Sequence, residues 1–255
     1  MCELLGMSAN IPTDIVFSFS GFRKRGGERG PHKDGWGIAF YEGKGVRVFR
    51  DPSPSAESRM ANFVRNYPIK SKSVIAHIRR ASTGKTALEN THPFVRELWG
   101  REWVFAHNGR VPKVRKRRLK YNRPVGGTDS EHAFCWILDN LREAFPRPPR
   151  KPEAYQALIR ELCERVAKVG SFNVLLSEGD YLYAHAATRL HWIVRKAPFS
   201  KARLIDEDLE VDFSDETTPN DRVAVIATAP LTDNEAWERC RRGEFAVFRD
   251  GDRIV

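Results

Sequence analysis

The sequence predicts an α+β protein with stacked β-sheets in the middle and helices outside. Its 255 residues can bury a sizeable core, and 41% hydrophobic and 30% charged residues are typical of a globular protein. Strand-like and helix-like segments also alternate along the chain. The Pro-rich stretch 146–152 is the best candidate for a linker, but the strands after it have too few helices to form a second domain. We therefore expect one domain over residues 1–255.

The first half of the chain predicts strands with buried residues and two helices. The expected elements are a strand over 2–7, a helix over 15–22, a hairpin of 36–42 and 46–50, a helix over 55–66, and strands over 73–80 and 102–108. The hairpin turns at Gly43-Lys44-Gly45. The Gly-rich stretch RGGERG ends the first helix, and Ser53-Pro54 introduces the second.

The second half begins with a strong helix signal. Thr128-Asp129-Ser130-Glu131 forms a capping-box sequence, and apolar residues at helical spacing follow it. A second amphipathic helix is expected over 153–168. The remaining expected elements are strands over 172–177, 181–187, 191–195, 223–228 and 245–249.

Composition and spacing exclude several classes of protein. No apolar run approaches the ~18 residues of a membrane span, and no secretory signal sequence opens the chain. The four cysteines are widely spaced without a CxxC pair, which argues against zinc and against a disulfide scaffold and suits the reducing cytoplasm. His77, His92 and His107 match no local ligand spacing. We expect no metal and no cofactor.

The positive charge is concentrated in one segment. The formal net charge is +10, and Arg110–Lys120 holds seven basic residues and no acidic one. Such a run could contact nucleic acid or an acidic partner. However, no stacking aromatic residues are interleaved within it, and no DNA-binding motif accompanies it. We expect a solvated, mobile loop over 110–124 rather than a nucleic-acid interface.

Cys2 directly follows the initiator methionine. Methionine aminopeptidases usually remove Met before a small residue, and removal would place a thiol and a free α-amino group on one residue. The thiol is a strong nucleophile once a base takes its proton. An α-amino group titrates near ~7.7–8.0, so it can serve as that base at neutral pH. The alternative is a small buried residue in the first strand.

Polar residues at the ends of expected strands could complete an amide-cleaving site. The planar Arg79 guanidinium matches a carboxylate, and Asp129 could bind an ammonium group. The Asn108 side chain and the Gly109 backbone N–H are candidate oxyanion donors. Each has a simpler explanation: Asp129 suits a helix start, Asn-Gly is a common turn, and Arg79 could just end a strand. Together they fit an α-amino acid with a side-chain amide, which is glutamine.

Six motifs in order resemble class II glutamine amidotransferases. They are Cys2, DGWG (34–37), AHIRRAS (76–82), THPF (91–94), AHNG (106–109) and TDSE (128–131). The segments MCELLGMSAN, PHKDGWGIAFYEGKG, ALENTHPF, RELWG and TTPND resemble the bacterial YafJ-like subgroup, and the resemblance runs essentially end to end.

The resemblance implies an N-terminal-nucleophile hydrolase fold, a four-layer αββα sandwich. It implies that Cys2 attacks the glutamine amide, giving a γ-glutamyl thioester and ammonia, with its own α-amino group as the base. Arg79 would bind the substrate carboxylate, and Asp129 with the Gly109 carbonyl would bind its ammonium. Asn108 and Gly109 would form the oxyanion hole.

The loop from Arg79 to about Leu88 would be a lid over the substrate, and Thr83 in this loop would contact the substrate. Arg80 and Thr83 stand where larger family members carry Trp and His. Larger members also carry a synthase domain, for which this chain has no room. We expect Trp36 and the loop near His32–Gly35 to contact the leaving-group side.

Three functions remain open from the sequence. The leading one is a stand-alone hydrolase of glutamine, or a donor of ammonia to a synthase on a separate chain. The second is hydrolysis of another γ-glutamyl amide, as in the amidase of ergothioneine synthesis. The third is a non-catalytic adaptor that binds nucleic acid through 110–120, whose function would survive Cys2→Ala and whose binding would depend steeply on salt.

Overall fold

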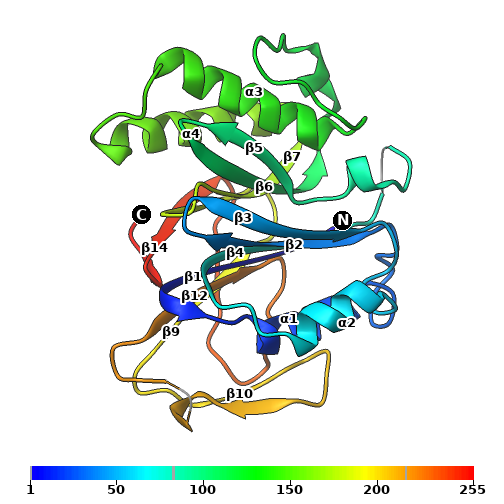
Figure 1. Ribbon diagram of the computed structural model, residues 1–255, viewed down its shortest axis with the longest axis vertical. Coiled ribbons are helices and arrows are strands. Elements are labelled where there is room, and N and C mark those ends of the chain that lie inside the picture. The colour runs from blue at the N-terminus through cyan, green and yellow to red at the C-terminus, as the bar shows by residue number, and fades with distance from the viewer. Residues whose placement is uncertain (1, 82–83, 216) are drawn as a thin grey trace.

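The computed structural model describes residues 2–81, 84–215 and 217–255 and is built in four layers (Figure 1). Helices α3 and α4 lie over one sheet, which packs face to face on a second sheet. Helices α1 and α2 cover the outer face of the second sheet. This is the α+β, four-layer αββα arrangement that the resemblance implies.

The helices and the strands have the following bounds. The helices are α1 (Val16–Lys24), α2 (Arg59–Asn66), α3 (Asp129–Ala144) and α4 (Pro152–Ala167), with short 3-10 helices η1 (Leu88–Asn90), η2 (Pro112–Lys116) and η3 (Phe213–Asp215). No helix in the described ranges is long and apolar enough to cross a membrane.

The sheet that contains β1, called here the β1 sheet, runs in spatial order β13 (Glu238–Arg239), β9 (His191–Lys196), β12 (Arg222–Ala227), β1 (Glu3–Thr13), β4 (Ser71–Ile78), β2 (Trp36–Glu42) and β3 (Gly45–Asp51). The other, the β6 sheet, runs β15 (Asp252–Arg253), β14 (Glu244–Arg249), β8 (Leu182–Ala186), β7 (Ser171–Ser177), β6 (Arg101–Arg110) and β5 (Phe94–Leu98). A separate hairpin pairs β10 (Lys201–Arg203) with β11 (Glu210–Asp212). Neighbouring strands are antiparallel in both sheets and in the hairpin.

Side chains alternate between two environments along each sheet. In β1, Leu4 belongs to the cluster between the sheets, whereas Leu5 belongs to the cluster beneath α1 and α2. In β6, Ala106 faces the other sheet and Phe105 faces α3 and α4. The period of two therefore sorts each strand into an inner face and a helix-covered face.

Two expected elements differ from the structure by four or more residues at one end. β1 extends to Thr13, well beyond the expected strand over 2–7. Helix α2 begins at Arg59 rather than at residue 55, because Ser58 is the residue that caps it. The Ser58 hydroxyl accepts the Ala61 N–H at 3.3 Å and donates to the Asp51 carboxylate at 2.5 Å.

Strand β5 was absent from the sequence-based prediction. It pairs with β6 across a two-residue turn at Trp99-Gly100, where φ is +61° and +71°. Two successive positive φ angles are the signature of a tight hairpin turn. β5 lies at the sheet edge and carries Arg96 and Glu97, so its apolar pattern is short.

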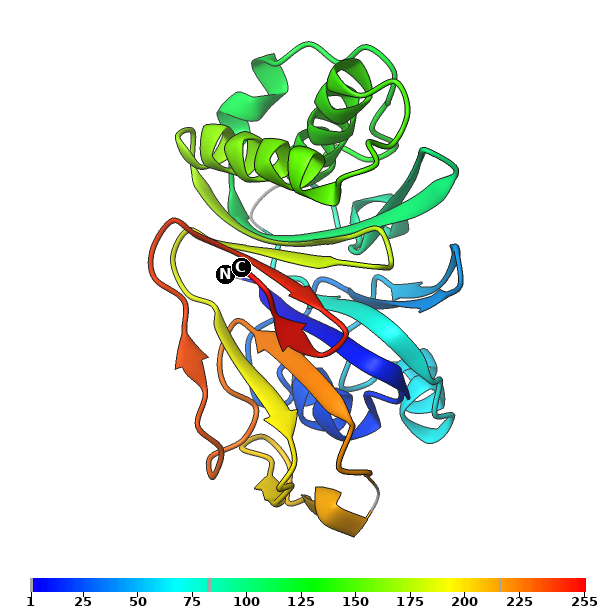
Figure 2. The ribbon, with the colours of Figure 1, turned by 90° about the vertical axis from the view of Figure 1, so that its left-hand side faces the viewer.

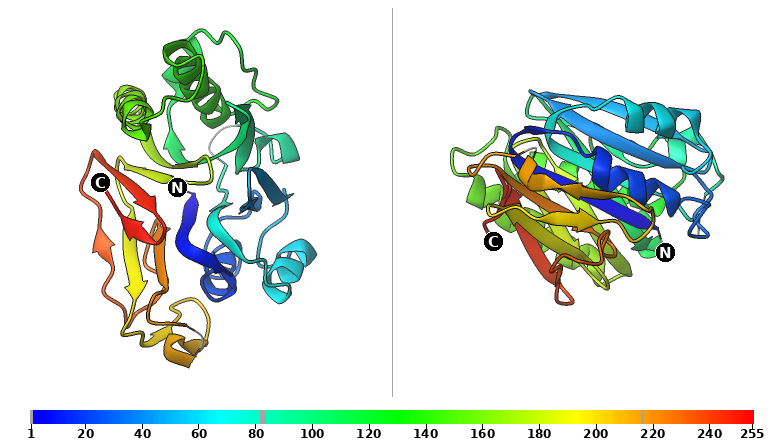
Figure 3. Two further views of the ribbon diagram at one scale, coloured as in Figure 1. Left: turned by 60° about the vertical axis from the view of Figure 1, so that its left-hand side comes forward. Right: turned by 90° about the horizontal axis from the view of Figure 1, so that it is seen from below.

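The Pro-rich stretch after α3 connects two helices of the same layer. Figure 2 shows α3 and α4 side by side above the β6 sheet, and Figure 3 shows α1 and α2 over the blue and cyan strands on the opposite side. The stretch therefore does not separate two sheets or two cores.

The basic segment 110–124 is attached to the helical layer and is not the free loop expected from its charge. Val114 of η2 is buried against α3. The Arg117 guanidinium lies 3.9 Å from the centroid of the Trp136 ring. The Asp139 carboxylate accepts the backbone N–H groups of three residues: Lys120 (2.6 Å), Tyr121 (3.2 Å) and Asn122 (2.9 Å). The other basic residues of the segment are exposed.

Candidate active site

Strand alternation places Cys2 and Asn108 on the facing surfaces of the two sheets. Cys2 is two residues before Leu4, so it shares the inner face of the β1 sheet. Asn108 is two residues after Ala106, so it shares the inner face of the β6 sheet. His77 joins the two sheets nearby, because its Nε2 lies 3.2 Å from the His107 carbonyl oxygen. Cys2 precedes β1 and Asn108 lies near the end of β6, at the same edge of the sandwich.

The Cys2 thiol contacts the end of β4. The Arg80 N–H donates to Sγ at 3.3 Å, and Sγ donates to the Arg80 carbonyl at 3.5 Å. Removal from water raises the pKa of the thiol, although the Arg80 N–H and the Arg79 charge act in the opposite direction. The thiol is therefore protonated at neutral pH, and its use as a nucleophile requires a base.

The Asn108 side chain is buried and has no hydrogen-bond partner within the described residues. Both Nδ2 and Oδ1 are shielded from solvent. A buried amide without partners destabilises the fold, so such groups are rare unless they serve a ligand or water. Asn108 thus offers two donor hydrogens between the sheets.

Gly109 occupies a position that requires glycine. Its φ is +154°, and a Cβ atom there would lie 2.0 Å from the Ser171 carbonyl oxygen. The backbone of β6 therefore approaches β7 more closely than any other residue would allow. This fixes the peptide between Asn108 and Gly109 at the end of the strand.

Arg79 is buried and surrounded by backbone carbonyls. Its Nη1 donates to the carbonyls of Asp34 (3.3 Å) and Lys85 (3.2 Å), and Nη2 donates to that of Gly84 (3.2 Å). The Asp34 carboxylate accepts the Ala81 N–H at 2.8 Å. The Thr86 hydroxyl also donates to the Asp34 carboxylate at 3.2 Å, so the loop that contains His32–Gly35 contacts Arg79 and both sides of the expected lid.

Asp129 stands at the first turn of α3. Its Oδ2 accepts the Val111 N–H at 2.7 Å and its Oδ1 accepts the Ser130 N–H at 3.1 Å. The Thr128 hydroxyl caps the helix by accepting the Glu131 N–H at 3.2 Å, which confirms the predicted helix start. A carboxylate oxygen accepts more than one hydrogen bond, so Asp129 keeps capacity for a ligand.

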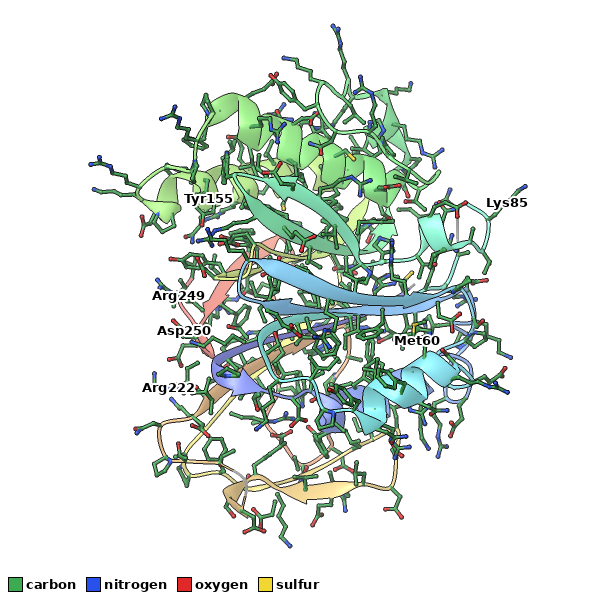
Figure 4. The ribbon with its side chains drawn as sticks, viewed as in Figure 1. Met60, Lys85, Tyr155, Arg222, Arg249 and Asp250 are labelled. Atoms are coloured by element: carbon green, nitrogen blue, oxygen red, sulfur yellow. The ribbon has the colours of Figure 1, made fainter. Side chains whose placement is uncertain are left out.

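Asn90 links the expected lid to the segment before Asp129, a contact that sequence reasoning missed. Its Nδ2 donates to the Lys85 carbonyl at 3.1 Å, and its Oδ1 accepts the Gly127 N–H at 2.8 Å. The Lys85 side chain itself extends into solvent at the lid (Figure 4). Asn90 lies in the ALENTHPF segment, where it is the last residue of η1 and is buried.

The prediction for Trp36 is wrong. Trp36 pairs with Ile78 in register, and both belong to the cluster beneath α1 and α2. Its ring centroid lies 5.7 Å from that of Phe19. Strand alternation turns Trp36 away from the inner face, where Gly37 pairs with His77. Thr83, the other expected lid contact, lies outside the described residues.

His77, His92 and His107 lie close together, and within the described residues hydrogen bonds hold His77 and His107 but not His92. The His77 and His92 ring centroids are 4.2 Å apart. The His107 ring faces α3, where Nδ1 lies 2.8 Å from the Ser130 hydroxyl. Burial lowers the pKa of His77 to about 3, so it is neutral at pH 7. In the described part of the chain, no group of three side chains could hold a metal ion.

The αββα layers define an N-terminal-nucleophile hydrolase fold. The family model of class-II glutamine amidotransferases matches residues 1–255, and the chain belongs to this family. It is 57% identical over 255 residues, covering all of both chains, to "Putative glutamine amidotransferase YafJ" of Escherichia coli (strain K12).

One solved structure agrees with this family assignment, and a second shares the fold. The crystal structure of a "predicted glutamine amidotransferase" from Pseudomonas aeruginosa PA01 is 48% identical in sequence and superimposes with a TM-score of 0.79. The alignment covers the whole of both chains. The allosteric regulatory enzyme of purine biosynthesis is 13% identical with a TM-score of 0.61. It aligns with 99% of this chain over 48% of its own, and shares the fold.

Proposed function

We propose that this protein is a stand-alone amidohydrolase in which Cys2 attacks the side-chain amide of glutamine. The observation that carries the proposal is the unpartnered, buried Asn108 amide on the face opposite Cys2. A preorganised donor kept without a protein partner is what a developing oxyanion requires. Family membership supports glutamine as the substrate.

The reaction requires a free α-amino group on Cys2, so Met1 has to be removed first. The amino group then takes the thiol proton, and a bond forms between Sγ and the amide carbon. The tetrahedral oxyanion is stabilised by Asn108 Nδ2 and the Gly109 N–H. The C–N bond breaks, ammonia leaves with the transferred proton, and water hydrolyses the thioester to glutamate and the free thiol.

Arg79 and Asp129 give the site its selectivity for an α-amino acid. The guanidinium would bind the substrate carboxylate, and the Asp129 carboxylate with the Gly109 carbonyl would bind the ammonium group. The carbonyls of Gly84 and Lys85 already contact Arg79, so the substrate carboxylate has to share or replace these contacts. Closure of the lid and recognition of the carboxylate are therefore coupled.

The test combines intact mass with a screen for ammonia release. The mass should correspond to a chain that begins at Cys2, and glutamine should yield equal amounts of glutamate and ammonia. The same screen should include asparagine and γ-glutamyl amides with larger leaving groups. If the protein prefers a bulky γ-glutamyl amide, that amide is the substrate in place of glutamine. Full activity with Met1 retained would contradict the mechanism.

A further inference from the structure

Two asparagines lie side by side on the inner face of the β6 sheet, and their side chains are used in opposite ways. Asn108 of β6 pairs in register with Asn173 of β7, and both are fully buried. The Asn108 amide has no partner within the described residues, whereas the Asn173 amide is almost fully bonded. The neighbouring inner-face residues Ala106 and Leu175 are apolar.

The hydrogen bonds of Asn173 fix the orientation of its amide. Nδ2 donates to the Asn108 carbonyl at 3.0 Å and to the Thr188 hydroxyl at 2.8 Å. Oδ1 accepts the Thr188 N–H at 2.9 Å. Exchanging Oδ1 and Nδ2 would place an oxygen against the Asn108 carbonyl and an NH₂ against an N–H, so only one orientation satisfies the network.

The carbonyl that Asn173 binds belongs to the peptide that carries the Gly109 N–H. A hydrogen bond to a peptide oxygen polarises the whole peptide and strengthens its N–H as a donor. Asn173 also restrains rotation of this peptide, because the Thr188 backbone N–H holds Oδ1 at the other end of the amide. On the opposite side, the Ser171 carbonyl leaves no room for a side chain at Gly109.

We infer that Asn173 is a positioning residue for the oxyanion hole, which orients and polarises the Gly109 N–H through the Asn108 carbonyl. The inference rests on the proposed function for its catalytic meaning, but the geometry it describes does not depend on turnover. It explains why a buried amide stands at this position of β7 among apolar neighbours. Asn173 then sets the backbone donor, and the free Asn108 amide supplies the side-chain donor.

Two variants and a matched control test the inference. Asn173→Asp keeps the shape and the acceptor for the Thr188 N–H but places an oxygen against the Asn108 carbonyl. Asn173→Leu removes the donor without adding charge. Thr188→Val is the control, because it removes a hydroxyl that Asn173 contacts but leaves the bond to Asn108 in place. Thermal unfolding establishes that each variant is folded.

The expected result is a selective loss of kcat. Both Asn173 variants should lower kcat by roughly 10- to 100-fold with KM within about twofold, since an oxyanion forms only in the transition state. Thr188→Val should stay close to wild type. A folded Asn173→Leu variant with wild-type kcat would overturn the inference, as would an equal loss in Thr188→Val or a loss confined to KM.

The amide resonance of Gly109 gives a readout that is independent of catalysis. Its ¹H and ¹⁵N shifts should move in both Asn173 variants and stay in place in Thr188→Val. If the wild-type protein releases no ammonia from any γ-glutamyl amide, the proposed function fails and this resonance still decides the inference. An unchanged Gly109 resonance in Asn173→Leu would overturn it.

Discussion

At the scale of single residues, Asn108, the proposed oxyanion donor, has a side chain that should destabilise the fold. Its amide is buried without a partner in the described chain, so replacing it by an apolar residue of similar size removes a desolvation penalty. We expect Asn108→Leu to lower kcat by about 10²- to 10³-fold while the melting temperature stays the same or rises.

The measurements are ammonia release and thermal unfolding on the same preparation. Asn173→Leu is the matched control, because it removes three hydrogen bonds and should lower the melting temperature. A drop in melting temperature of equal size in the two variants would mean that the Asn108 amide is bonded after all.

The cysteines should differ in their reactivity. Burial raises the pKa of Cys163 and of Cys240 to about 12, and that of Cys135 to about 11. Cys2 is the partly exposed member of the four. We expect iodoacetamide to modify Cys2 first in the folded protein, because thiol reactivity follows access and thiolate fraction.

Mass spectrometry of the alkylated peptides identifies which cysteine is modified first. Modification of Cys2 should abolish ammonia release, as should Cys2→Ala, whereas Cys163→Ala should retain turnover. Loss of turnover that follows alkylation of a core cysteine while Cys2 is unmodified would remove Cys2 from the mechanism.

At the scale of elements, the segment after η2 depends on one carboxylate of α3. Asp139 accepts the backbone N–H groups of Lys120, Tyr121 and Asn122. We expect Asp139→Ala to lower the free energy of unfolding by about 2–4 kcal/mol, because bonds to a buried charge are stronger than neutral ones. Hydrogen exchange at these three amides should accelerate.

The control uses the exposed ion pair of the same segment. Lys120 also contacts Glu143 at the surface, and exposed pairs contribute little. Glu143→Ala should change the free energy of unfolding by less than about 1 kcal/mol and leave the exchange of the three amides in place. Equal protection of these amides in Asp139→Ala would show that Asp139 does not hold the segment.

Local patterns predicted most of the elements. α1, α3, α4 and the β2–β3 hairpin lie where periodicity, the capping residue Thr128 and the Gly-rich turn placed them. β5 was missed because an edge strand with charged residues lacks clear alternation. The tight turn at Trp99-Gly100 was the available signal.

The candidate site was only partly predictable. The order of the motifs identified Cys2, Arg79, Asn108 and Asp129 as candidates. Their side chains are a thiol, a guanidinium, an amide and a carboxylate, and these types suggest cleavage of an amide. Trp36 was misassigned because a sequence does not show which face of a strand meets the second sheet. The contacts of Asn90 and Asn173 depend on chain segments far apart in sequence, which no local pattern reveals.

At the scale of the whole molecule, Glu178 should make stability depend on pH. Burial raises the pKa of its carboxyl from an ordinary 4.5 to about 8, although Tyr155 and Tyr183 donate hydroxyl bonds to it. The native state therefore keeps this proton over a range in which the unfolded chain has lost it. The stabilising contribution is complete below pH 4.5 and is lost as the pH rises to about 8.

The change to test is Glu178→Gln. Between pH 4.5 and about 8, the free energy of unfolding of the wild type should fall by up to about 1.4 kcal/mol for each pH unit. That of the variant should fall less steeply. Denaturant titrations at several pH values measure the difference. Glu97→Gln, at an exposed position, should follow the wild-type curve, and parallel curves for Glu178→Gln would contradict the expectation.

The path of the chain through the two sheets has a consequence for how activity is regained. The polypeptide visits the β1 sheet, crosses to the β6 sheet, returns through β9 and β12 and crosses again to β14. Among the described strands, no contiguous fragment contains one complete sheet without strands of the other, so neither face of the proposed site can form independently. During refolding, ammonia release should return only in the last cooperative step. A partly folded chain should have no activity, even if its helical content is native.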